Sequence, residues 1–195
     1  ASLQEEATLD RIEARLQELH AKASTDVDRR ALRLLEFMME RRAAEMAHGT
    51  GPHVDAALRA LREAFKGAWA EGEAEMMSEF LASQGRVFDG PLAKEQISQL
   101  ETLLNGALEG SNVRLIIAGH LASTQSAYGR HAEAAQVLKG ALEGYRHANG
   151  GLLPGWAHSY LGVLATYLQS TGSWMEAESL WLEELKRSYN GEEIL

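Results

Sequence analysis

Residues 128–135 read YGRHAEAA, and residues 171–178 read TGSWMEAE. Both segments have a glycine, expected in a turn, followed by the Glu-Ala pair that is typical of the first turn of a helix. Each is preceded by an apolar stretch rich in small residues and followed by another stretch with helical periodicity. We therefore expect residues 112–190 to form two helix-turn-helix repeats, one after the other.

A second internal match extends this repeat. Residues 104–110 read LNGALEG and residues 138–144 read LKGALEG, so that six of seven positions agree at a distance of 34 residues. Fainter copies are FKGAW at residues 65–69 and WLEEL at residues 181–185. Four copies at spacings of 34 to 43 residues predict four helix pairs.

The glycines of the first three copies, Gly67, Gly106 and Gly140, are expected inside a helix. Glycine costs about 1 kcal/mol relative to alanine there, and close packing on a neighbouring repeat would offset that cost. The fourth copy has Glu183 and Glu184 at the Gly-Ala positions. We expect nothing to pack against these carboxylates, so that the fourth pair ends the array as a capping repeat.

The first 24 residues predict a separate amphipathic helix, because apolar residues recur at spacings of three and four. They are Leu9, Ile12, Leu16 and Leu19. Two interpretations remain open: the stripe packs on the next helix, or it forms a short coiled-coil seam with another chain.

Thr25 is expected to cap the second helix, with Asp28 in its first turn. The apolar face of this helix is unusually wide and predicts burial from two sides. It comprises Leu32, Leu34, Leu35, Met38, Met39, Ala43 and Met46.

The repeats resemble the tetratricopeptide repeat family, particularly its longer variant of about 42 residues found in kinesin light chains and bacterial regulators. The matching positions are Leu121, Ala122, Gly129, His131, Glu133, Ala134, Leu138 and Ala141, then Leu164, Ala165, Gly172, Trp174, Glu176, Ala177, Trp181 and Glu184. His131 and Glu184 depart from the family pattern. The resemblance implies an all-α fold, a right-handed superhelix of about four helix pairs spanning residues 25–195, with residues 1–24 as an added N-terminal helix in a single-domain protein.

Composition restricts the classes of partner. The net charge is −9, with −1 on residues 1–62 and −8 on residues 63–195, which disfavours nucleic acid as a partner. No apolar run approaches the roughly 20 residues that span a bilayer, so we expect no membrane association. The absence of cysteine fits a cytoplasmic protein.

The sequence contains no credible catalytic set, and we expect neither an enzyme nor a cofactor. His48 and His53 flank a glycine-rich loop, but no further ligand pattern completes a metal site around them.

In the resembling family, ligands lie against the concave surface formed by the first helices of the pairs. Helical periodicity places ten residues of this chain there: Ile116, Gly119, His120, Ser123 and Ala127 from one repeat, and Ser159, Gly162, Val163, Thr166 and Ser170 from the next. Gly119 and Gly162 are equivalent positions, which would serve either the close approach of a ligand or packing between the two helices. Trp156, Tyr160 and Trp174 would be either anchors for a partner or core residues.

These features predict a noncatalytic interaction module, a scaffold or adaptor that binds a peptide or helix of a partner protein in a concave groove. One alternative is a ligand- or peptide-sensing regulatory domain of a larger protein. Another is self-association into a homo-oligomer through residues 1–24.

Overall fold

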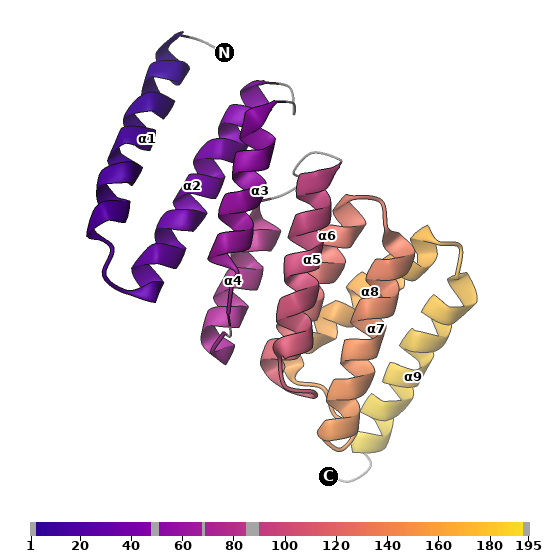
Figure 1. Cartoon of the computed structure of the whole chain (residues 1–195). Coiled ribbons are helices and arrows are strands. Elements are labelled where there is room, and N and C mark those ends of the chain that lie inside the picture. Colours follow the sequence, from indigo (N-terminus) through magenta and orange to yellow (C-terminus); the bar gives the residue numbers. More distant parts are fainter. Residues whose placement is uncertain (1–2, 48–50, 68, 85–89, 193–195) are drawn as a thin grey trace. The chain divides into compact units, whose positions relative to one another are not determined.

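The computed structural model describes residues 3–47, 51–67, 69–84 and 90–192, and within them it is entirely helical (Figure 1). The helices are α1 (Leu3–Lys22), α2 (Asp26–Met46), α3 (Pro52–Ala64), α4 (Glu71–Ser83), α5 (Pro91–Gly106), α6 (Asn112–Ala127), α7 (His131–Ala148), α8 (His158–Ser170) and α9 (Trp174–Glu192), with a 3-10 turn at Gly155–Ala157. The all-α prediction is confirmed, whereas the right-handed superhelix stays a prediction. None of the described helices has the length and apolar character needed to cross a membrane.

The chain divides into two compact units. Unit 1 comprises residues 1–68 and 87–96, and unit 2 comprises residues 69–86 and 97–195. Helix α5 begins in unit 1 and ends in unit 2. Each unit is described separately below.

In unit 1, α2 lies between α1 and α3 (Figure 1). The predicted cap of α2 is confirmed: the Thr25 hydroxyl accepts from the Asp28 amide at 3.0 Å, and the Asp28 carboxylate accepts from the Thr25 amide at 3.2 Å. Phe37, Ala44 and Leu61 are buried between α2 and α3. This reciprocal cap fixes the start of α2 and thereby the face that it turns toward α3.

The expectation that α2 is buried from two sides is confirmed only in part, because α1 and α3 both pack on α2 but leave some of its apolar face uncovered. Leu32 and Phe37 are 8% and 2% exposed, but Leu35 and Met38 are 49% and 44% exposed. Helix α3 covers one side of α2, and α1 covers only part of the other. An apolar strip on α2 is therefore left open to solvent.

Unit 2 is built around one core drawn from α6, α7, α8 and α9. Its most deeply buried large residues include Leu115, Leu121, Leu138, Leu142, Leu161 and Leu164. Gly129 and Gly172 have φ angles of +76° and +80°, so the two predicted glycine turns are confirmed. These turns reverse the chain between α6 and α7 and between α8 and α9.

The predicted role of the repeat glycines is wrong. Gly67 follows the end of α3 with a φ of +99°, so it does not lie inside a helix. A Cβ atom added at Gly106, the last residue of α5, or at Gly140, inside α7, would meet nothing within 4 Å. No neighbouring helix approaches either glycine closely, and the helical cost of Gly140 is not offset by packing.

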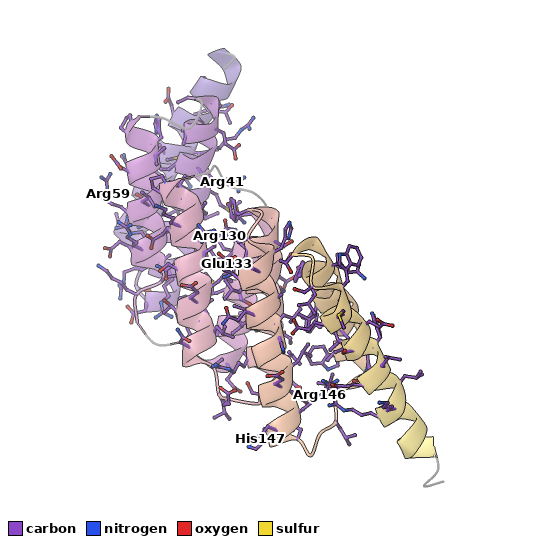
Figure 2. The ribbon with its side chains drawn as sticks, turned by 90° about the vertical axis from the view of Figure 1, so that its right-hand side faces the viewer. Arg41, Arg59, Arg130, Glu133, Arg146 and His147 are labelled. Carbon is purple, nitrogen blue, oxygen red and sulfur yellow. The ribbon has the colours of Figure 1, made fainter. Side chains whose placement is uncertain are left out.

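Glu184 also differs from its expected role. Its side chain is only 14% exposed and bonds Arg146 of α7, whereas the outer face of α9 exposes Trp174, Met175 and Leu182. Figure 2 shows Arg146 extending from α7 toward α9. The prediction that nothing packs against these carboxylates is therefore wrong for Glu184, because the phase of α9 turns it toward the half-buried Arg146, whereas the Glu183 side chain is 63% exposed.

Candidate partner-binding face

The ten predicted site residues lie on two helices of unit 2, five on α6 and five on α8, and we call them the α6–α8 face. Six are exposed: Ser123, Ala127, Ser159, Val163, Thr166 and Ser170. The other four, Ile116, Gly119, His120 and Gly162, are half-buried. The six exposed residues make most of this face open to solvent.

Gly119 and Gly162 are not equivalent in the structure. A Cβ at position 119 would lie 2.7 Å from the Cζ and hydroxyl oxygen of Tyr160, so the ring of this α8 residue occupies the space above Gly119. A Cβ at position 162 would meet only Trp181, at 3.9 Å, which is an ordinary contact. The two alternatives, helix packing and close approach of a ligand, therefore apply to different glycines. Gly119 serves packing between α6 and α8, whereas Gly162 leaves space for an approaching group.

Three hydroxyl groups on this face of α8 are bonded to carbonyls three or four residues earlier in the chain. Ser159 donates to Trp156 at 3.0 Å, Thr166 to Gly162 at 3.0 Å, and Ser170 to Thr166 at 2.9 Å. Each hydroxyl therefore has an acceptor without a partner molecule. If an apolar group covered these hydroxyls, each would still donate its hydrogen bond.

Large apolar side chains accompany these hydroxyls. Val163 is 37% exposed and Trp156 is 44% exposed. Trp156 also contacts the ring of Tyr160 edge-on, at 6.0 Å between ring centroids. Trp156 and Trp174 are therefore not core residues, while Tyr160 is half-buried against α6.

His120 connects α6 to α4. Its Nδ1 lies 2.8 Å from the Ser78 hydroxyl, which itself lies 2.7 Å from the Glu75 carbonyl. Ser78 has a single hydroxyl proton, and when it is donated to the Glu75 carbonyl the contact with His120 requires that Nδ1 be the donor. Burial lowers the pKa of His120, and the nearby carboxylates of Glu79 and Glu75 partly counteract that effect.

Sequence reasoning did not identify Ser78, whose side chain is fully buried. A signal was present, because Ala74, Ser78 and Leu81 follow helical spacing and all three are buried on one side of α4. A hydroxyl on the buried, apolar side of a helix is expected to form a hydrogen bond. The spacing does not say that the partner would be His120.

Histidine does not gather into a metal centre in the described part of the chain, where no three His, Asp or Glu side chains are grouped to hold an ion. His53 instead lies 2.7 Å from the carboxylate of Glu40 in unit 1. His48, considered with it from the sequence, lies outside the described residues.

The exposed residues of the α6–α8 face carry no charge and combine hydroxyl groups with small or apolar side chains on α6 and α8. The half-buried His120 connects this face to the buried Ser78 of α4. Comparison of the chain with protein-family models gives no match, and comparisons with curated proteins and with solved structures give none either, so the tetratricopeptide resemblance rests on the residues of the chain itself.

Proposed function

We propose that this chain is a noncatalytic interaction module that holds a peptide or helix of a partner protein against the α6–α8 face. The observation that carries the proposal is the self-contained bonding of Ser159, Thr166 and Ser170. A hydroxyl that already has an acceptor loses little when an apolar partner displaces water from it. The face can therefore be covered at low desolvation cost.

The apolar groups beside these hydroxyls contribute favourable free energy of binding when a partner buries them. Trp156 and Val163 are exposed, and burial of apolar surface contributes roughly 25 cal/mol per Å². Aromatic residues are also enriched among the side chains that dominate binding energies. The space at Gly162 allows a partner to approach the backbone of α8 closely.

The test uses a displayed library of helical peptides selected on the wild-type chain. Binding of the selected peptides is then measured on Gly162→Arg, which places a long cationic side chain on the face. We expect a loss of at least tenfold in affinity. Helicity and melting temperature should not fall, because the nearest side chain would lie 3.9 Å from the new Cβ and arginine is a better helix former than glycine.

Gly140→Arg is the matched control, since Gly140 is also a helical glycine and has open space around it on α7. Peptides should bind this variant as they bind the wild type. If Gly162→Arg folds normally and still binds the selected peptides with unchanged affinity, the α6–α8 face is not the binding surface.

A further inference from the structure

Helices α1 and α2 of unit 1 form the two sides of an apolar groove of about 680 Å³. We call it the α1–α2 groove, and its lining comprises Thr8, Leu9, Arg11, Ile12, Arg15, Leu16, Leu19, Leu35, Met38, Met39 and Arg42. We propose that this groove binds an amphipathic helix of a partner protein whose apolar stripe is flanked by acidic residues.

The first argument is the apolar surface that the groove leaves in water. Ile12, Leu35 and Met38 are 42%, 49% and 44% exposed and line one continuous hollow. The exposed side of α2 is the part of its wide apolar face that α1 does not cover. Contiguous exposed apolar surface of this kind marks interaction sites on folded proteins.

The second argument is the shape of the groove. Its α1 side runs from Thr8 to Leu19, which at 1.5 Å per residue is a length of about 17 Å. Two neighbouring helices form the sides, as in proteins that receive an amphipathic helix in a hydrophobic groove. A partner helix of about three turns would match that length.

The third argument is the sign of the charges. The charged residues among the lining are Arg11, Arg15 and Arg42, and none of the lining residues is acidic. Arg15 pairs with Glu18, and Arg42 pairs with Glu45, but at both pairs the arginine side chain is more than half exposed. Such exposed pairs contribute little, so a partner carboxylate can compete for these guanidinium groups.

The positive charge of the arginines is confined to the groove side of α1, as the other side of this helix shows. The ionisable residues lining a separate hollow there are Asp10, Glu13, Glu40 and His53, and none is an arginine or lysine. A helix with basic flanks would therefore be favoured on that side and disfavoured in the α1–α2 groove. The hollows on the two sides of α1 therefore favour partner helices of opposite charge.

The same charges argue against a second copy docking groove to groove. A two-fold interface places one surface patch against itself. The three arginines would then face three arginines, and like charges at an interface oppose association.

The experiment uses two synthetic helical peptides of about three turns with the same leucine stripe, one flanked by Glu and one by Lys. Fluorescence anisotropy should show the Glu peptide binding the wild-type chain at least tenfold more tightly. Met38→Glu should weaken the Glu peptide at least tenfold, and Arg11→Glu/Arg15→Glu/Arg42→Glu should reverse the preference between the two peptides. Circular dichroism establishes that both variants remain folded.

The control variant Arg29→Glu/Arg59→Glu/Lys66→Glu changes the net charge equally at exposed positions outside the lining. It should keep the wild-type preference, and Gly162→Arg should bind the Glu peptide normally, which separates this groove from the α6–α8 face. Equal affinity of the two peptides for the wild-type chain would overturn the proposal. So would a dimer in sedimentation equilibrium that Met38→Glu dissociates, because the occupant would then be a second copy.

Discussion

His120 of α6 and Ser78 of α4 are joined by a hydrogen bond of 2.8 Å between Nδ1 and the serine hydroxyl, and Ser78 has no exposed surface. Since the hydroxyl proton is directed to the Glu75 carbonyl, neutral His120 should carry its proton on Nδ1. Two-dimensional NMR of ¹⁵N-labelled protein at pH 7.5 checks this through the ring nitrogen shifts. A protonated Nε2 with a bare Nδ1 would show that Ser78 donates to the histidine instead.

The same residue predicts a pH dependence of stability. Burial lowers the pKa of folded His120 below its ordinary value of 6.5, so between these two values the unfolded chain binds the proton more readily. The stabilising contribution is therefore present above pH 6.5 and is lost as the pH falls from there toward the lowered pKa. Urea midpoints at pH 7.5 and 5.5 should differ more for wild type than for His120→Gln. An equal difference would place the titration on other histidines.

The features that sequence patterns predicted correctly depend on neighbours in the chain. Thr25 caps α2 through Asp28, three residues away, and Gly129 and Gly172 turn the chain where the next helix begins. These outcomes follow from local backbone geometry and need no knowledge of the packing. None of the ten candidate residues of α6 and α8 is in the core, while their role in binding stays a prediction.

The features that were missed depend on residues far apart in the chain. Gly119 and Gly162 look equivalent until Tyr160, 41 positions after Gly119, is seen over the first glycine. Glu184 looks like an outward-facing end of the array until Arg146 is found beside it. A periodic pattern gives the arc of a helix on which a residue lies, but the neighbouring side chain is set by the packing of several helices.

The two glycines predict opposite responses to alanine. Gly162→Ala should stabilise the fold by up to about 1 kcal/mol, because alanine is the better helix former and its Cβ fits. Gly119→Ala gains the same propensity but forces a shift of the Tyr160 ring, which also contacts Trp156, and overpacking typically costs about 1–3 kcal/mol.

Chemical denaturation should therefore rank Gly162→Ala above the wild type and Gly119→Ala at or below it. In a Tyr160→Ala background the cost at position 119 should disappear. Persistence of that cost without the ring would mean that another group limits the space at Gly119.

Among the single substitutions considered, we expect the largest loss of stability from breaking the ion pair of Arg146 and Glu184. Their side chains are 13% and 14% exposed, and the Arg146 Nε is buried without a hydrogen-bond partner among the described residues. Burial lowers the pKa of Arg146 while Glu184 counteracts this. Glu184→Ala leaves a largely covered cation without its carboxylate, so the loss should exceed about 1 kcal/mol and stay below the roughly 3–5 kcal/mol of a fully buried pair.

A matched control lies between the same two helices. Lys139 of α7 and Glu176 of α9 form an ion pair of 2.6 Å in which both side chains are 47% exposed. Glu176→Ala should cost less than about 1 kcal/mol, because solvent screens the exposed pair. Arg146→Met/Glu184→Leu should lie close to wild-type stability, since well-packed apolar residues can replace a buried pair. Urea denaturation measures the loss of stability in each variant. Equal losses for Glu184→Ala and Glu176→Ala would contradict the prediction that the less exposed ion pair contributes more.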